Sequence, residues 1–397
     1  MILTHKEFQK IASGLQPVGK AFIDGKFCWA ADGAKFDTTN PATGEVLAEV
    51  AHCKSTDVDR AVSAARRVFN EGTWSQAEPE ERKEVLLKIA QLVRDHANEL
   101  AVLESLDTGK TINDCLDEIG GEVPNFFQWY AELADKAFGK IAPTGPSAMA
   151  LITKEPAGVA GAVLPWNFPL VMAAWKIAPS LAVGCSAVIK PAEQTPLSTI
   201  RLAELMHEAG VPPGVINIVP GYGETAGKAI GLHNDIDTVS FTGSTEVGRM
   251  FMRYSGDSNL KGVGLEMGGK SPFIVLEDAA INDELIEHAA MSAFWNGGQN
   301  CSANMRQLIA KPLVDEFTGR ILDRVKAFKL GDPLDPATDI GSMITKDHKE
   351  VVMSYIQSGM DEGAEMVTGG ESDLPGYFIN PTVFQNVKPD MKIAREE

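Results

Sequence analysis

Val159-Ala160-Gly161-Ala162-Val163-Leu164 is a short apolar run, and a helix-like stretch begins after Pro169. The same alternation of apolar run and helical pattern then repeats along the chain. The further strands are expected at Ala187–Lys190, Val215–Val219 and Thr238–Thr242, and their helices at 196–209, near 223–232 and from Ser244. Strands that alternate with helices form a parallel sheet covered on both faces. The sequence therefore predicts a doubly wound α/β fold, in which ligands bind at the carboxyl ends of the strands.

The segments on either side of this alternation predict further units. Before it, 20–50 shows short strands and turns, and helices are expected at 55–71, 79–106 and 112–136. After Gly269 a second α/β unit is expected, with strands at Phe273–Leu276 and Gln307–Ala310 and helices at 282–296, 312–328 and 346–362. After the run Phe378–Phe384, no closing helix or strand is expected up to the last residue, Glu397. A length of 397 residues suffices for two or three domains.

Composition excludes several classes of function. The formal net charge of −18 would repel nucleic acid and anionic membranes. Five cysteines without a CxxC pair argue against a disulfide framework or a zinc site and favour a reducing compartment. Met1–Lys6 has no signal-peptide pattern, and prolines and Lys176 interrupt the apolar region Val159–Ile189. We expect a cytoplasmic protein that binds no nucleic acid, membrane or metal.

Two glycine-flanked reactive groups suggest covalent catalysis. Cys301 follows Gly297-Gly298-Gln299-Asn300, where glycines allow close backbone approach and a thiolate would be positioned to attack a carbonyl. Glu266 stands between apolar Leu265 and Met267, and partial burial would raise its pKa toward that of a useful base. The alternatives are a cysteine that acts as a small buried hydrophobe and an exposed carboxylate at a strand end.

Two further strand ends carry residues suited to a nucleotide. Phe241–Gly248 runs from a strand into a helix whose N-terminus would accept a diphosphate, although the GxGxxG fingerprint is absent. The alternative is an ordinary helix capped by Ser244 or Thr245. Lys190 and Glu193 would hold ribose hydroxyls, and a carboxylate at the 2′-hydroxyl favours NAD over NADP. The alternative for this pair is a solvated loop.

The end of the first strand offers polar and aromatic groups. Asn167 has an amide N–H that could meet an oxyanion. Phe168, Met172 and Trp175 follow helical spacing, which indicates either a core stripe or the lining of a substrate tunnel. Lys176 lies in an apolar stretch and would need a partner if it is buried.

As a set, five runs resemble the aldehyde dehydrogenase superfamily, and the resemblance covers the chain from about residue 20. The runs are Pro165–Pro169, Lys190–Glu193, Phe241–Gly248, Leu265–Lys270 and Gly298–Cys301. The resemblance implies an EC 1.2.1 type oxidation of an aldehyde to a carboxylic acid through a thiohemiacetal and a thioester on Cys301. The implied cofactor is NAD, with NADP as an alternative.

The resemblance also implies residue roles. The catalytic group comprises nucleophile Cys301, general base Glu266, oxyanion donor Asn167, and Lys176, which moves protons away from the base. Cofactor contacts are implied for Trp166, Lys190, Glu193, Gly243, Ser244, Gly248 and Glu397. Phe168, Met172 and Trp175 match the substrate tunnel.

The resemblance gives expected domain bounds. These are a Rossmann-like NAD-binding domain at 1–139 and 157–267, an oligomerisation hairpin at 140–156, and a catalytic domain at 268–397. Family members continue beyond the position of Glu397, so the resemblance implies a C-terminally truncated chain without the partner strand of the hairpin. The full-length form would be a homodimer or homotetramer.

Within the superfamily the chain most resembles bacterial γ-glutamyl-γ-aminobutyraldehyde dehydrogenases. The runs that carry this resemblance are His233–Asp237 and Gly256–Lys261, and Trp129–Glu132 is shared with aminoaldehyde enzymes. The expected substrate is an aminoaldehyde or its γ-glutamyl derivative. The alternatives are an acylating relative that transfers the thioester to coenzyme A, and an inactive fragment or binding-only protein on the same fold.

Overall fold

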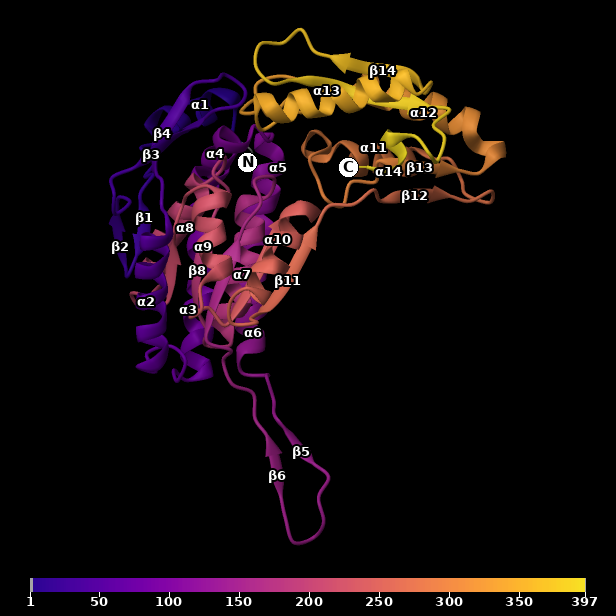
Figure 1. Cartoon of the computed structure of the whole chain (residues 1–397). Helices are drawn as coiled ribbons and strands as arrows, with labels where there is room; N and C mark the ends of the chain where they lie inside the picture. Colours follow the sequence, from indigo (N-terminus) through magenta and orange to yellow (C-terminus); the bar gives the residue numbers. More distant parts are fainter. Residues whose placement is uncertain (1–2, 397) are drawn as a thin grey trace.

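The computed structural model describes residues 3–396. A large lobe contains the main sheet and its helices, and the chain crosses after β11 (Gly262–Met267) into a smaller lobe that ends near the junction of the two (Figure 1). The lobe boundary falls where the sequence predicts a new unit, after Gly269.

The main sheet has seven strands in the order β11-β10-β7-β8-β9-β1-β2. Five are mutually parallel: β7 (Val159–Val163), β8 (Ser186–Lys190), β9 (Ile216–Ile218), β10 (Thr238–Gly243) and β11. The antiparallel strands β1 (Ala21–Ile23) and β2 (Lys26–Cys28) complete the edge beyond β9. Asp24 and Gly25 join them with φ of 52° and 74°, as a tight hairpin turn requires. The sheet is therefore mixed, whereas the alternation of strands and helices predicts only its parallel part.

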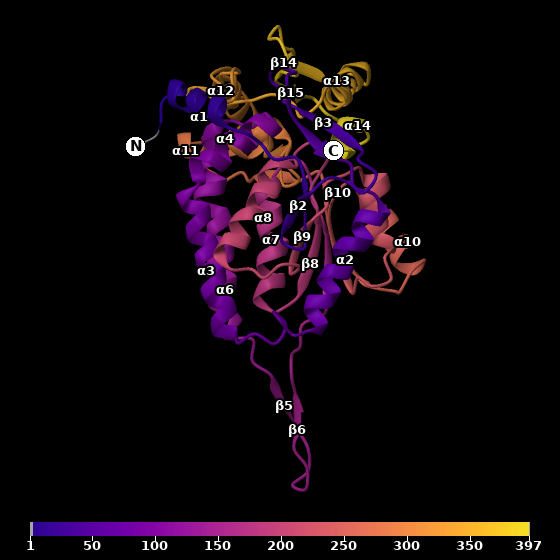
Figure 2. The same ribbon diagram turned by 90° about the vertical axis from the view of Figure 1, so that its left-hand side faces the viewer.

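Helices cover both faces of this sheet (Figure 2). On one face lie α3 (Pro79–Asp95), α6 (Val123–Ala134), α7 (Pro169–Ala182) and α8 (Leu197–Ala209), and on the other α2 (Ser55–Asn70), α9 (Lys228–Leu232) and α10 (Thr245–Gly256). Every residue of β7 and β8 is buried between the two layers. Strands buried on both faces explain the continuous apolar runs in the sequence.

Two helices expected to be continuous are each divided. The stretch 79–106 forms α3 and α4 (Ala97–Thr108), which break at His96, and α4 ends at Gly109 with φ of 77°. A glycine in the left-handed region is a common helix stop. The stretch 112–136 forms α5 (Ile112–Asp117), a π-helical turn at Glu118–Glu122, and α6.

Residues near 140–156 form a hairpin that projects from the large lobe (Figures 1 and 2). Its strands β5 (Lys140–Ala142) and β6 (Ala150–Ile152) pair with each other in antiparallel register. Ile141, Met149 and Leu151 are exposed along it.

The remaining elements of the large lobe are N-terminal. They are α1 (His5–Gly14), which packs on α4, and the antiparallel pair β3 (Lys35–Thr39) and β4 (Val46–Ala51).

The small lobe combines two short sheets with four helices. The elements are β12 (Pro272–Val275) and β13 (Arg306–Ile309) in parallel, β14 (Glu365–Glu371) and β15 (Ile379–Gln385) in antiparallel register, and α11 (Asp283–Phe294), α12 (Val314–Lys326), α13 (Lys346–Asp361) and α14 (Lys392–Arg395). A core around Phe317, Ile321 and Val325 holds α11 and α12 together. The expectation that no helix follows Phe384 is wrong, because the short α14 closes on α13.

The lobes meet in a close backbone contact between Gly109 and Gly341. The Ser342 amide donates to the Gly109 carbonyl at 3.1 Å. A Cβ added to Gly341 would lie 1.9 Å from that carbonyl oxygen, so no side chain fits there. Glycine at 341 therefore allows the lobes to approach.

We expect Gly341→Ala to destabilise the protein by about 1–3 kcal/mol, the usual cost of overpacking. The measurement is urea unfolding followed by circular dichroism. Gly319→Ala is the control, because Gly319 lies within α12 with nothing within 4 Å of an added Cβ. Alanine there should stabilise the helix slightly. Equal stability of the two variants would contradict the close contact.

Candidate active site

A cavity of about 540 Å³ lies at the junction of the lobes. The large lobe lines it with residues at the carboxyl ends of β7, β10 and β11, and the small lobe with the loop that carries Cys301 and with parts of α13 and β15. This is the sheet edge at which the alternating strands predict a ligand.

The loop before Cys301 has an unusual backbone. A 3₁₀ turn, Trp295–Gly298, contains Asn296, Gly297 and Gly298 with φ of 53°, 64° and 80°. Three successive residues in the left-handed region turn the chain sharply after α11, and the glycines adopt it without strain. The turn brings Cys301 to the cavity with its side chain exposed. The alternative of a buried structural cysteine is therefore wrong.

Asn167 lies against this loop from the other lobe. Its Nδ2 donates to the Gln299 carbonyl at 3.0 Å, and Asn296 Nδ2 donates to the Asn167 carbonyl at 3.2 Å. An amide Nδ2 carries two hydrogens, so one N–H of Asn167 is left over. Asn167 and Cys301 line the same cavity, so that second N–H is available for an oxygen bound beside the thiol.

Gln299 holds the loop to the small lobe. Its Oε1 accepts from the Ile344 amide at 3.0 Å, and its Nε2 donates to the Asn296 carbonyl at 3.1 Å and to the Ser342 carbonyl at 3.4 Å. Sequence reasoning missed this function, because the partners at 342–344 are about forty residues away along the chain. A buried amide beside a glycine pair was the available signal.

Phe168, the N-cap residue of α7, and the helix residues Met172 and Trp175 divide between two places. Phe168 and Met172 line the cavity with Cys301, but Trp175 does not. Trp175 is 44% exposed and packs on Phe126 with ring centroids 5.3 Å apart. Trp175 lines a separate cavity together with Lys176 and Glu266, and the assignment of the three residues to a substrate tunnel stays a prediction.

The same cavity is also lined by groups suited to a nucleotide. Gly243 and Ser244 line it, and Ser244 Oγ caps α10 by accepting from the Val247 amide at 3.3 Å. Ser244 is thus a helix cap and a cavity residue. Thr242 Oγ1 is buried and finds no hydrogen-bond partner among residues 3–396, although Thr242 lines this cavity.

Trp166 and His348 also line the cavity, and their ring centroids lie 5.0 Å apart in an edge-to-face arrangement. Burial lowers the pKa of His348, which therefore favours the neutral form. Sequence reasoning missed this histidine, because nothing near it in α13 indicates a site.

The other predicted cofactor residues stand outside the lining of this cavity. Lys190 is buried at the end of β8, and its Nζ pairs with Glu193 Oε2 at 2.8 Å, so the alternative of a solvated loop is wrong for the lysine. Gly248 lies within α10, where an added Cβ would be 2.7 Å from Met267 Sδ. It allows α10 to pack on β11 and does not line the cavity. Glu397 lies outside the described residues.

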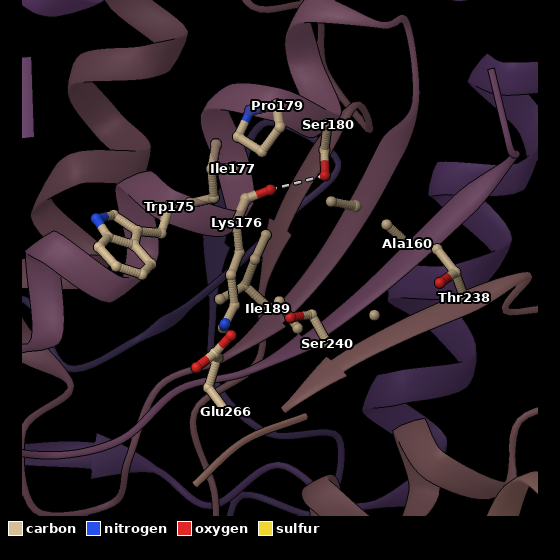
Figure 3. Close-up of a pocket in the computed structure, with 13 residues that line it drawn as sticks. Ala160, Trp175, Lys176, Ile177, Pro179, Ser180, Ile189, Thr238, Ser240 and Glu266 are labelled. Carbon is tan, nitrogen blue, oxygen red and sulfur yellow. Dashed lines mark hydrogen bonds between the residues drawn. The ribbon is translucent and has the colours of Figure 1, made fainter. Parts of the chain in front are cut away.

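Glu266 and Lys176 line a second cavity of about 290 Å³. Figure 3 shows the Lys176 ammonium directed at the Glu266 carboxylate, with Trp175 to one side. Burial lowers the pKa of Lys176, and the nearby Glu266 charge opposes this effect. The next two residues, Met267 and Gly268, line the Cys301 cavity, whereas Glu266 itself lines only the second one.

The expectation that Leu265 and Met267 bury Glu266 is wrong. Glu266 is exposed, because β11 is the edge strand of the sheet and has no neighbour on its outer side. The geometry matches an exposed strand-end carboxylate, but one that faces a buried lysine.

The described part of the chain shows no cluster of histidine, cysteine, aspartate or glutamate side chains that could hold a metal ion. Within residues 3–396, no helix has both the length and the apolar character needed to cross a bilayer.

The profile of the aldehyde dehydrogenase family matches residues 29–397. The chain therefore belongs to the aldehyde dehydrogenase family and is an enzyme of the EC 1.2.1 type. It is 46% identical over 396 residues to aminoacetaldehyde dehydrogenase of Pseudomonas aeruginosa, covering 100% of this chain and 80% of the relative.

Solved structures agree with this assignment. An indole-3-acetaldehyde dehydrogenase in complex with NAD⁺ is 43% identical with a TM-score of 0.98, covering 100% of this chain and 81% of that one. A γ-glutamyl-γ-aminobutyraldehyde dehydrogenase of Burkholderia cenocepacia is 45% identical with a TM-score of 0.97, covering 100% and 80%. The expected truncation is not confirmed by these alignments and stays a prediction.

Proposed function

We propose that this protein oxidises an aldehyde to a carboxylic acid, with NAD as cofactor, through a covalent adduct on Cys301. The observation that carries the proposal is that Cys301 and Asn167 line one cavity, while Asn167 uses only one of its two N–H groups to hold the Gln299 carbonyl. A nucleophile beside a fixed N–H donor is the pairing that addition to a carbonyl requires.

Residues that line the cavity, together with a pair at a neighbouring strand end, fit a dinucleotide. The buried hydroxyl of Thr242 lacks a partner, and the N-terminus of α10 at Ser244 favours a diphosphate. Lys190 and Glu193 are paired at the next strand end and would hold a ribose, and Trp166 gives an apolar wall. Bound there, NAD would supply the acceptor for the hydride that the substrate loses.

Cys301 and Asn167 would share the first step. The Cys301 thiolate adds to the aldehyde carbon, and the Asn167 N–H holds the oxygen as it becomes negative. Because Asn167 also binds the Gln299 carbonyl, the donor keeps a fixed position relative to the thiol. Loss of hydride then leaves an acyl group on Cys301 as a thioester.

Glu266 and Lys176 would serve the second step. Glu266 is exposed at a strand end, so its side chain meets little packing resistance in turning from Lys176 toward the thioester. There it would deprotonate the water that releases the acid. Burial lowers the pKa of Lys176, so its ammonium would release a proton into the cavity that it lines, and the resulting neutral amine would take up the proton from Glu266.

For the substrate we propose an aminoaldehyde or its γ-glutamyl derivative. The support is the likeness to aminoacetaldehyde dehydrogenase and to γ-glutamyl-γ-aminobutyraldehyde dehydrogenase. Phe168 and Met172 would hold the carbon chain of the substrate. The net charge of −18 attracts cationic substrates over a distance.

We also propose that the protein associates through the hairpin β5–β6, as a homodimer or homotetramer in the cytoplasm. The hairpin stands away from the large lobe and exposes apolar side chains, which association would cover (Figure 1).

The purified 397-residue protein, mixed with NAD and a short aminoaldehyde, tests the function directly. We expect NADH to form, detected by absorbance. NAD binding without any NADH, for a range of aldehydes, would instead support the binding-only alternative.

We expect Glu266→Gln to retain a rapid burst of NADH, equal to about one equivalent per site, and to lose steady-state turnover by about 10²–10⁴-fold. Acyl transfer to Cys301 needs no base at Glu266, whereas hydrolysis of the thioester does. Stopped-flow absorbance separates the two phases. Glu277→Gln is the control, since Glu277 is an exposed residue after β12 and lines neither cavity. Loss of the burst together with turnover would contradict the role of Glu266 in deacylation.

A further inference from the structure

A buried cluster of charged side chains lies directly behind Phe168. The Lys110 side chain is fully buried, and its Nζ is 2.5 Å from Glu118 Oε2 and 3.8 Å from Glu104 Oε1. The same Nζ lies 4.1 Å from the centroid of the Phe168 ring. Burying three ionisable groups is costly, so an apolar core would serve stability at least as well.

The ring of Phe168 is held on more than one side. In addition to the Lys110 ammonium, it packs on Trp295, whose ring centroid is 5.0 Å away. Trp295 begins the turn that leads to Cys301. Phe168 itself is only 6% exposed, yet it lines the cavity with Cys301. The position of this ring therefore depends on the charge behind it.

Glu104 holds the start of α7. Its Oε2 accepts from the Leu170 amide at 3.2 Å and from Ser198 Oγ at 2.9 Å. The first amides of a helix have no partner within the helix, and Phe168 at the N-cap position has no side chain that could accept them. The Glu104 carboxylate thus replaces the missing cap, immediately after Asn167 and Phe168.

The backbone next to Lys110 also contacts the small lobe. The carbonyl of Gly109, next to Lys110, accepts from the Ser342 amide at 3.1 Å. The segment at 342–344 holds Gln299, whose carbonyl in turn accepts from Asn167. Residues 104–118 therefore connect the start of α7 with the loop that carries Cys301.

We propose that Lys110 is a positioning residue for aldehyde oxidation: held by Glu118 and Glu104, it fixes the Phe168 ring and the first turn of α7, and through them the spacing between the Asn167 amide and Cys301. Lys110 touches neither substrate nor cofactor, so it acts through Phe168. Sequence analysis gave no hint of this, because the lysine lies in a stretch that reads as an ordinary helix end.

Burial and the Lys110 charge have opposite effects on the two glutamates of the cluster. Burial raises the pKa of Glu118 to about 8 and raises that of Glu104, while Lys110 opposes both shifts. One oxygen of each glutamate, Oε1, finds no hydrogen-bond partner among the described residues. The cluster is thus not optimised for stability, as expected if its place is set by the site.

A double-mutant cycle on Lys110 and Phe168 tests the proposal. The variants are Lys110→Met, Phe168→Leu and the two combined, each with Glu118→Gln so that the carboxylate at 118 does not lose its partner. Glu104 keeps its hydrogen bonds from Leu170 and Ser198 in every variant. The reference for the cycle is Glu118→Gln alone. Lys261→Met is the matched control, because Lys261 is also buried but donates to the Gly231 carbonyl at 2.8 Å, at the opposite end of the sheet.

In the Glu118→Gln background, we expect Lys110→Met to lower kcat by about 10–10²-fold, the size of effect that a small displacement of reacting groups produces. The dissociation constant for NAD, measured by tryptophan fluorescence, should change less than twofold. Phe168→Leu should then lower kcat by a smaller factor in the Lys110→Met protein than in the protein that retains Lys110, because the effects of substituting two residues in contact do not add. Lys110→Arg should recover most of the loss.

Because the inference rests on the proposed function, wild-type activity is measured first, and its absence would overturn the function itself. If the wild type is active, independent effects of Lys110→Met and Phe168→Leu on kcat would overturn the inference. An unchanged kcat in folded Lys110→Met/Glu118→Gln would overturn it as well. Thermal unfolding of all variants shows which are folded, and non-additive shifts in Tm are a second, activity-independent sign of the Lys110–Phe168 contact.

Discussion

Cys301→Ala should lower aldehyde oxidation by at least about 10⁴-fold, the largest effect that we expect from any single substitution. Without the thiol no covalent adduct forms, and no other cysteine lies in the cavity to replace it. Cys301 is exposed, so its side chain contributes little to packing and the variant should fold. The measurement is NADH formation together with the midpoint of urea unfolding.

Cys28→Ala is the matched control for this variant. Cys28 is half-buried in β2, and its sulfur accepts from Arg60 at 3.8 Å, far along the sheet from the cavity. It should retain wild-type activity. If Cys301→Ala oxidised aldehydes at more than a few per cent of the wild-type rate, Cys301 could not be the nucleophile.

Asn167→Ala should lower kcat by about 10²–10³-fold, the usual cost of removing one oxyanion donor. The structure leaves one N–H of Asn167 available beside Cys301, after the other has bound the Gln299 carbonyl. The KM for the aldehyde should change little, because the N–H meets a charge that develops only during the reaction. Steady-state kinetics with a saturating cofactor separates the two parameters.

The substitution also removes a hydrogen bond between the lobes, and Asn113→Ala controls for that loss. Asn113 Nδ2 donates to the Pro336 carbonyl at 2.9 Å, a contact of the same type away from the cavity. The two variants should lose similar stability, while only Asn167→Ala loses kcat. A comparable fall in kcat for both variants would mean that Asn167 acts by holding the lobes and not as a donor.

The large lobe could be predicted to a considerable extent from the sequence. The apolar runs of β7 and β8 are buried on both faces, and only a strand between two helix layers leaves such a continuous pattern. The break at Gly269 similarly indicates where the chain leaves the large lobe. The antiparallel strands β1 and β2 escaped prediction, since strand pairing at an edge depends on residues distant in the chain.

The sequence allowed us to predict which types of residue form the site, but much less of how they are arranged in space. Cys301 and Asn167 come together as expected, because each ends or follows a strand or helix that the pattern locates. Glu266 is exposed and faces Lys176, which follows from β11 being an edge strand, a fact of sheet order rather than of local sequence. Gln299 owes its position to partners about forty residues further along the chain, and Lys110 to partners that include Phe168 of another segment, so no local spacing reveals them.

The most direct test of the account is mass spectrometry of Glu266→Gln after mixing with NAD and an aldehyde. We expect the peptide that contains Cys301 to gain the mass of the acyl group, and hydroxylamine to remove that mass as it cleaves the thioester. The adduct should be absent when Cys301→Ala is added. Acylation of another residue, or turnover by the wild type with no adduct on Cys301 in Glu266→Gln, would contradict covalent catalysis by this cysteine.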